Sequence, residues 1–543
     1  MIPKSTSPGL SPLAILFVGL ALSIGWGVRG NWGHEYGAMI PGALAAMAAV
    51  LVSGRDDWHR RIPLFAFFGA VGWSFGGSMS YAHVIGYTHS GHAESVVYGF
   101  ACLFVIGFIW GFLGGAGTAL PAFLSRARIT ELLLPVFAVF AAWVGQGVYF
   151  RVKFAGLHEQ VVQGILTKAE MHKQLAWMDW YDTDWIAVIV AAAAVLVLAV
   201  ARRRICWGTS LVLYMCAGWW LGFTLLTVGL GLHMTPPRSD NWSGALGMTI
   251  GVIAFLMRRR EWEILWAAIV TGFFGGLGFS GATLVKLVLV HPGFQERVFG
   301  GAVSSNWHSI LEQTFGLIAG IGVAVAMGYL STRAARHSED PSVRRWAEPV
   351  CVLFVMLVVS YVNIVKNLDA VWLKDPRTLP DVMWGLSSST WFHLAYLALA
   401  VTILLPILAY YRGRELAALP ASRLGKGQLF FIVFLWWIVI GNLSRSVPFR
   451  EIRLITEGMI HLNACLCTLI ALLLPGAVRA AGVLAMPNLR QLVKLTALTV
   501  AIGAVLVVAG ELALVRGLWG DTFAGHGGKH IRFGPDATIN QKE

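Results

Sequence analysis

Residues 96–118 read VVYGFACLFVIGFIWGFLGGAGT, a run with no charged side chain. A helix of about 20 apolar residues crosses the roughly 30 Å hydrocarbon core of a bilayer. Similar runs recur from one end of the chain to the other. We predict about 15 membrane segments, near 11–28, 37–53, 63–80, 96–118, 131–150, 185–201, 207–232, 243–257, 264–290, 309–331, 349–365, 391–411, 428–443, 455–475 and 495–515. The predicted fold class is therefore an all-α polytopic membrane protein.

The composition supports this class and argues against a nucleic-acid-binding protein. Of the 543 residues, 57% are hydrophobic and only 13% are charged, whereas roughly a quarter of the residues in a soluble domain are charged. The net charge of +13 comes from short basic clusters between apolar runs, such as 202–204 and 258–260. Such clusters set the orientation of membrane helices. Cysteine spacing gives no zinc motif, and nucleotide-binding motifs are missing in a usable setting, so we predict neither a metal nor a cofactor.

Basic residues are unevenly shared between alternate loops. The set that begins with residues 54–62 is richer in Lys and Arg than the other set, which nevertheless contains the two longest loops. Because cytoplasmic loops carry the excess of Lys and Arg, we predict a multi-pass protein of the cytoplasmic membrane with its amino terminus in the cytoplasm.

The sequence also contains a weak internal repeat. SIGWGVRGNWGHEYGAMIPG at 23–42 resembles TPPRSDNWSGALGMTIG at 235–251, with Asn31-Trp32 aligned on Asn241-Trp242. An even number of helices per copy makes the copies parallel, as in several transporter classes. We predict a first six-helix repeat at 1–204, a second at 205–427, a partial third of three helices at 428–515 and a polar tail at 516–543.

The predicted binding residues lie at a helix break in each repeat, which is rich in glycine in the first copy and contains Pro236 and Pro237 in the second. Unwound backbone at membrane depth is tolerated where it lines a cavity, and Arg can hold a carboxylate or phosphate. The candidates are Arg29, Asn31, Trp32, His34, Glu35, Arg238, Asp240, Asn241 and Trp242. The alternative is that these residues only anchor and cap helices at the membrane boundary.

Two carboxylates at membrane depth have a histidine one helical turn away. Glu312 follows His308 by four residues, and Glu457 precedes His461 by four, so each pair shares a helix face. We predict a proton relay at these residues, with structural hydrogen bonds as the alternative.

The long loop at 151–184 ends in an aromatic and acidic motif, WMDWYDTDW at 177–185. Rings suit the apolar faces of sugars, and Asp179, Asp182 and Asp184 suit their hydroxyl groups. A helix lying in the membrane interface has the same composition. The loop at 366–390 occupies the corresponding place in the second repeat.

Three functional hypotheses follow. The first is a secondary transporter for a small polar or anionic solute, with or without coupling to protons, whose partners are that solute and the bilayer. The alternative is a membrane-embedded transferase that acts at the extracytoplasmic face on a lipid-linked or cell-envelope substrate. A structural subunit of a membrane complex would need no site at all.

Overall fold

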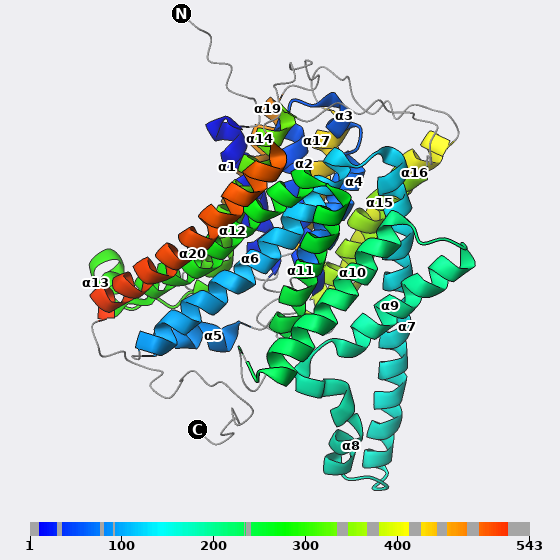
Figure 1. Cartoon of the computed structure of the whole chain (residues 1–543), viewed down its shortest axis with the longest axis horizontal. Helices are drawn as coiled ribbons and strands as arrows, with labels where there is room; N and C mark the ends of the chain where they lie inside the picture. Colours follow the sequence, from blue (N-terminus) through cyan, green and yellow to red (C-terminus); the bar gives the residue numbers. More distant parts are fainter. Residues whose placement is uncertain are drawn as a thin grey trace, which may run out of the picture. The chain divides into compact units, whose positions relative to one another are not determined.

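The structure is a computed structural model that describes residues 10–29, 35–75, 81–90, 93–232, 234, 241–333, 346–365, 380–411, 425–441, 453–474 and 488–519. Nearly all of these residues are helical (Figure 1). The first helices in chain order are α1 (Pro12–Arg29), α2 (Glu35–Val52), α3 (Asp56–His59), α4 (Ile62–Phe75), α5 (Ala82–Tyr87), α6 (Ala93–Phe123), α7 (Arg126–Val162), α8 (Lys168–Leu175), η2 (Ala176–Asp182) and α9 (Trp185–Ala201).

The following elements are α10 (Trp207–Gly222), η3 (Phe223–Gly229), α11 (Asn241–Arg259), α12 (Trp262–Val290), α13 (Pro292–Phe299), α14 (Trp307–Ser331), α15 (Ala347–Leu353), η4 (Phe354–Val359) and η5 (Tyr361–Val365). A two-stranded antiparallel hairpin of β1 (Val382–Met383) and β2 (Leu386–Ser387) precedes the last helices. These are α16 (Ser388–Tyr411), α17 (Lys426–Gly441), α19 (Arg453–Leu473) and α20 (Leu489–Trp519).

The chain is an all-α, multi-pass membrane protein. Within the described residues, 10 helices are long and apolar enough to cross a membrane, and shorter apolar helices lie at 36–52, 62–75, 185–201 and 427–441. Each predicted membrane segment overlaps a helix, the one at 243–257 being α11. The total number of crossings and the repeat organisation stay predictions.

By its internal contacts the chain divides into two compact units. Unit 1 comprises residues 1–77, 99–123 and 262–523, and unit 2 comprises 78–98, 124–261 and 524–543. Each unit draws helices from both of the long predicted repeats. The repeat boundaries are statements about sequence similarity, and they remain predictions.

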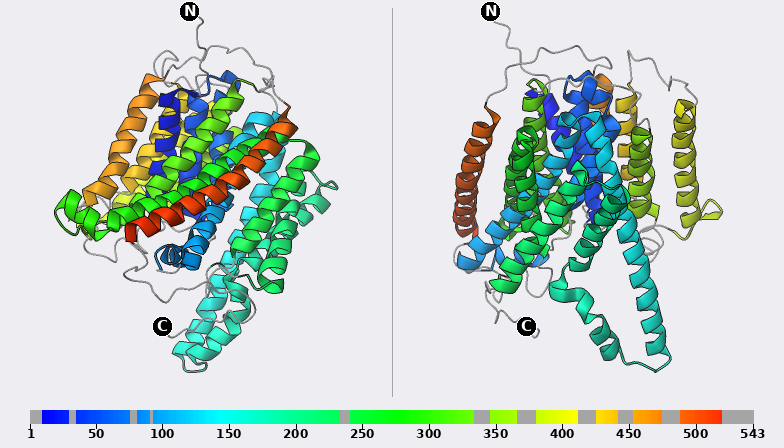
Figure 2. Two further views of the ribbon diagram at one scale, coloured as in Figure 1. Left: turned by 60° about the vertical axis from the view of Figure 1, so that its left-hand side comes forward. Right: turned by 45° about the vertical axis from the view of Figure 1, so that its right-hand side comes forward.

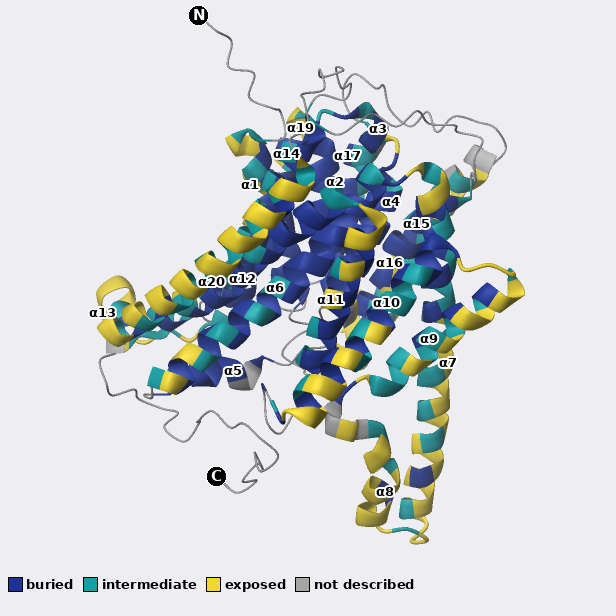
Figure 3. Cartoon of the chain, viewed as in Figure 1, coloured by how far each residue is buried: buried dark blue, intermediate teal, exposed yellow. Residues whose placement is uncertain are grey.

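Helix α1 lies at the centre of unit 1, where it packs along α2 and α14. Every residue from Phe17 to Arg29 is buried, which is expected of a helix that is apolar on all sides and surrounded by other helices. Figure 3 shows the buried interior of the α1, α2 and α4 region in dark blue. The polar end of α1 is therefore held inside a packed apolar unit.

Glycines let α1 and α14 approach each other closely. A Cβ atom at Gly316 would lie 2.7 Å from the carbonyl oxygen of Leu22, and one at Gly320 would lie 2.8 Å from the Cα atom of Gly19. Small residues at such positions permit backbone contact between membrane helices. The backbones of α1 and α14 therefore lie in close contact, and Leu317 of α14 packs against Gly19 of α1.

Helix α20 lies at the edge of unit 1, along α12. Its buried residues are Val493, Glu511 and Val515, and most of its remaining surface is exposed and apolar (Figures 1 and 3). In a membrane protein such a surface faces lipid, because hydrocarbon is as apolar as the side chains themselves.

Unit 2 is built on α7, α9 and α10, with α11 packed on α10. Val139, Val195 and Cys216 join the first three helices in a small apolar core. Helix α7 has 37 residues, which at 1.5 Å per residue give about 55 Å, well beyond the thickness of the hydrocarbon core. Its second half is mostly exposed and contacts α8 (Figure 2).

The close crossing of α6 and α12 in unit 1 gives the first testable prediction. A Cβ atom at Gly275 would lie 2.3 Å from the carbonyl oxygen of Gly107, whereas one at Gly281 meets nothing within 4 Å. Gly275→Ala should lower the free energy of unfolding by about 1–3 kcal/mol through overpacking. Gly281→Ala, on the same helix, should leave it unchanged or slightly higher. Thermal unfolding of the purified variants in detergent measures both, and equal midpoints would contradict the predicted helix crossing.

Candidate functional site

Arg29 ends α1 inside the core of unit 1. Its side chain is only 2% exposed, and its Nη1 donates a hydrogen bond to Oε1 of Glu312 on α14 at 2.7 Å. The guanidinium carbon lies 5.0 Å from the ring centroid of Trp26 and 5.5 Å from that of Trp110. A charge this deeply buried requires a counter-charge, and aromatic faces add further stabilisation to a desolvated cation.

Glu312 lies one turn after His308 near the start of α14. The helix begins where the Asn306 side chain accepts a hydrogen bond from the backbone N–H of Ser309. His308 Nε2 lies 3.5 Å from the same Oε1 atom of Glu312 that pairs with Arg29. The side chain of His308 is 43% exposed, whereas that of Glu312 is 1% exposed. His308 therefore connects a buried ion pair to the surface.

A second buried carboxylate, that of Glu457 on α19, lies in the same polar region. Glu457 accepts hydrogen bonds from the Thr456 hydroxyl group and, at 3.3 Å, from Nδ2 of Asn306. Gln313 Nε2 donates to the backbone carbonyl of Thr456 at 2.9 Å. Asn306 and Gln313 lie before and after Glu312 in the chain, so these bonds hold Glu457 beside the first turns of α14.

The two predicted relay pairs thus differ in geometry. His308 approaches the side chain of Glu312, but the Nδ1 atom of His461 bonds to the backbone carbonyl oxygen of Glu457 at 2.9 Å. The second contact lies within α19 and involves the backbone, and a proton relay at either pair stays a prediction. We name the buried network the Glu312 cluster, and its members are Arg29, Asn306, His308, Glu312, Gln313, Thr456 and Glu457.

Aromatic rings surround the Arg29 end of this cluster. Trp26 lies 4.9 Å from Trp110 and 4.7 Å from Phe315 between ring centroids, and Trp73 lies 6.1 Å from Trp26. Gly114 accommodates the Trp73 indole, since a Cβ atom there would lie 2.3 Å from the ring. Edge-to-face contacts of this kind hold large rings in fixed positions, so the ion pair lies beside a rigid, dry wall.

The other predicted binding residues are only partly described. Asn31, Trp32, His34, Arg238 and Asp240 lie outside the described residues, and of Glu35 only the backbone, at the start of α2, is described.

Asn241 and Trp242 begin α11 in unit 2. The Asn241 side chain accepts a hydrogen bond from the backbone N–H of Asp184 and donates one to its carboxylate. Sequence reasoning did not foresee this contact, and the pairing of the two helix breaks around one cavity stays a prediction.

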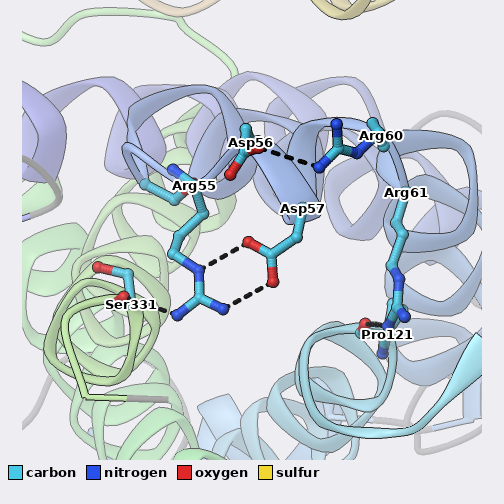
Figure 4. A network of polar contacts seen from close by, with 8 residues as sticks. Arg55, Asp56, Asp57, Arg60, Arg61, Pro121 and Ser331 are labelled. Carbon is cyan, nitrogen blue, oxygen red and sulfur yellow. Dashed lines mark hydrogen bonds and ion pairs between the residues drawn. The ribbon is translucent and has the colours of Figure 1, made fainter. Parts of the chain in front are cut away.

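A second buried ion pair lies at the opposite end of α14, in the segment between α2 and α4 (Figure 4). Arg55 Nε and Nη2 donate to the two carboxylate oxygens of Asp57 at 2.8 and 2.6 Å. Arg55 Nη1 also donates to the backbone carbonyl of Ser331, the last residue of α14, at 3.1 Å. Arginine stabilises a helix end in this way, because the last carbonyl groups have no partner within the helix.

Arg61 makes the same kind of contact with a second helix. It is 1% exposed, and its Nη1 donates to the carbonyl oxygen of Pro121, in the last turn of α6, at 2.9 Å. Nearby, burial lowers the pKa of the His59 imidazole below its ordinary value of 6.5, and the Asp56 carboxylate opposes that shift. We name Arg55, Asp57, Arg61 and Ser331 the Arg55 latch.

Sequence analysis missed the Arg55 latch because it counted Arg55 and Arg61 as ordinary basic loop residues. The structure buries both of them. A signal was nevertheless present, since the segment places Asp57 two residues from Arg55, beside a tryptophan, in a very short connection between two apolar helices. Opposite charges in so short a connection can pair rather than face water.

Within the described residues, no group of three or more His, Cys, Asp or Glu side chains is arranged to hold a metal ion. No protein-family model, curated protein or solved structure matches this chain. The chemistry of the site therefore rests on its own geometry, which combines a buried ion pair with a partly exposed imidazole beside it.

The segment between α2 and α4 holds a buried and an exposed ion pair, and the two can be compared directly. Asp57→Asn should lower the free energy of unfolding by about 3–5 kcal/mol, because Arg55 is left buried without its counter-charge. Asp56→Asn removes the exposed pair with Arg60, whose side chains are 60% and 46% exposed, and should cost about 1 kcal/mol or less. Thermal unfolding of the two variants is the measurement. Equal losses would show that the Asp57 pair is not buried as described.

Proposed function

We propose that this chain is a secondary transporter that moves a small anionic solute together with a proton across the cytoplasmic membrane. The observation that carries the proposal is the contact of one carboxylate oxygen of Glu312 with both Arg29 and His308, at 2.7 and 3.5 Å. Intramembrane ionisable groups of this kind mark ion and proton pathways.

The proton would control whether Arg29 is available to a solute. In the arrangement described here, Glu312 neutralises Arg29. A proton taken from water by the exposed His308 and passed to Glu312 removes the negative charge, and the guanidinium group then favours an anion. Since solute and proton would each increase the affinity for the other, they would move together.

The surrounding rings support an anion as the solute. Among the described residues, the indole N–H groups of Trp26 and Trp73 have no hydrogen-bond acceptor, although both side chains are buried. A buried donor without an acceptor costs about 1–3 kcal/mol. A carboxylate or phosphate near Arg29 would offer acceptors to these groups in addition to its contacts with the guanidinium.

The two ion-pair networks at opposite ends of α14 support alternating access. The Glu312 cluster joins the first turns of α14 to α1 and α19, and the Arg55 latch joins its last residue to the segment after α2. With the amino terminus in the cytoplasm, as the loop charges predict, the Arg55 latch closes the cytoplasmic end. Transport would open one network while the other stays closed.

Proteoliposomes containing the purified chain and an interior pH indicator test this proposal. Phosphate, acetate, succinate and glutamate are supplied one at a time, with and without a proton gradient. We expect at least one of them to accumulate with the gradient and to carry protons inward. Glu312→Gln should reduce the proton-coupled movement of the anion about tenfold or more. Movement of the anion down its own concentration gradient should continue, which would show that the variant is folded.

Asp56→Asn is the matched control, because it makes the same carboxylate-to-amide change at an exposed position, and it should transport like the unmodified chain. Full proton coupling in Glu312→Gln would contradict the proposal. So would the absence of flux for every anion together with chemical conversion of a lipid-linked donor, which would favour a membrane-embedded transferase.

A further inference from the structure

The motif at 177–185 forms a short 3₁₀ helix, η2, followed by α9 in unit 2. In a 3₁₀ helix the side chains at positions i and i+3 lie one above the other, separated by about 6 Å along the axis. Trp177 and Trp180 have this spacing. They are 47% and 40% exposed, respectively, so two large indole rings are presented on one face of the helix.

Other rings fix the orientation of these two indoles. Trp185, the first residue of α9, lies 6.1 Å from Trp177 and 6.0 Å from Trp180, with interplanar angles of 69° and 86°. Behind them, Phe223 lies 5.1 Å from Trp180 and is fully buried. Edge-to-face packing on a buried support makes the exposed pair a rigid surface.

Polar groups lie at the edge of the same surface. Asp184, directly before Trp185, is exposed. Asn241 fixes it from α11 with two hydrogen bonds, 2.8 Å from its backbone N–H and 2.7 Å to its carboxylate oxygen Oδ2. The Lys153 ammonium group lies over the ring of Trp177, 5.3 Å from its centroid. A fixed acceptor and a cationic donor therefore lie close to the rings.

This combination differs from a membrane-interface belt of tryptophans. Belt residues are explained by an apolar ring and a polar tip at the level of the lipid headgroups, and they need no carboxylate held beside the rings. The exposed Asp184 carboxylate instead gives this surface a hydrogen-bond acceptor beside the rings. Aromatic walls with a few fixed polar groups are the usual construction of small-molecule sites.

We propose that Trp177, Trp180, Trp185 and Asp184, here named the tryptophan ledge, bind carbohydrate. Two adjacent pyranose rings would stack on the exposed indoles, and sugar hydroxyl groups would donate to the Asp184 carboxylate. The ligand is a neutral glycan of two or more rings, either free or as the headgroup of a glycolipid. This site belongs to unit 2 and does not rest on the transport proposal, which concerns unit 1.

Saturation-transfer NMR on the full-length protein in lipid nanodiscs tests the ledge with three neutral trisaccharides, maltotriose, cellotriose and triacetylchitotriose. We expect at least one trisaccharide to bind. Trp180→Ala should weaken its binding about tenfold, the effect of losing roughly one stacking contact. Trp180→Phe should retain most of the affinity, because it keeps a ring.

Trp384→Ala is the matched control, since Trp384 is a highly exposed tryptophan, at 88%, in the β1–β2 turn of unit 1. This variant should bind the trisaccharide like the unmodified chain. An unchanged thermal midpoint of Trp180→Ala shows that the loss of binding is local. If a glycolipid carrying the same glycan displaces the free trisaccharide, the natural ligand is a glycolipid headgroup. If it does not, the natural ligand is a soluble sugar.

Three results would overturn the proposal. The first is the absence of saturation transfer to all three trisaccharides in the unmodified protein, and the second is an equal loss of binding in Trp384→Ala. The third comes from a spin label at Trp180→Cys: collisions with lipid-soluble oxygen rather than with a water-soluble relaxation agent would place the ledge in the bilayer and identify it as an interface anchor.

Discussion

The ion pair between Arg29 and Glu312 is the constraint on which the organisation of unit 1 depends. Two charged groups with 2% and 1% exposure lose their hydration, and replacing only one of them leaves an uncompensated buried charge at a cost of about 3–5 kcal/mol. The end of α1 must therefore stay beside the first turns of α14. The rings of Trp26 and Trp110 then pack on the guanidinium, and Ser23 adds a hydrogen bond to the backbone carbonyl of Gln313 at 2.8 Å.

The contacts along α14 combine hydrogen-bonded ends with a closely packed middle. Hydrogen-bonded charges hold its first turns and its last residue, while the glycines at 316 and 320 bring its backbone close to that of α1. Ion pairs of this kind have two discrete states, formed and broken, between which packed helices move as rigid bodies. This mechanical pattern is what a carrier needs, and it links the geometry to the proposed transport cycle.

The helices were predictable from the sequence and the pairing of their charges was not. Runs of apolar residues mark the helices, and spacing alone put His308 and Glu312 on one face. No local pattern relates Arg29 to Glu312, which are 283 positions apart, or Asn241 to Asp184, 57 positions apart. The burial of Arg55 and Arg61 was not predictable for the same reason. An arginine in a loop is expected to face water, and only the fold brings the carbonyl groups of α14 and α6 against these two side chains.

The central claim is that Glu312 exchanges a proton and so releases Arg29. Infrared difference spectroscopy of the protein in membranes, acidified from about pH 8 to about pH 5, the range in which histidine titrates, measures this most directly. The account predicts a protonated-carboxyl carbonyl band that is absent in Glu312→Gln and present in Asp56→Asn. A spectrum with no Glu312-dependent band over this range, with or without a transported anion, would show a permanently ionised pair and contradict the account.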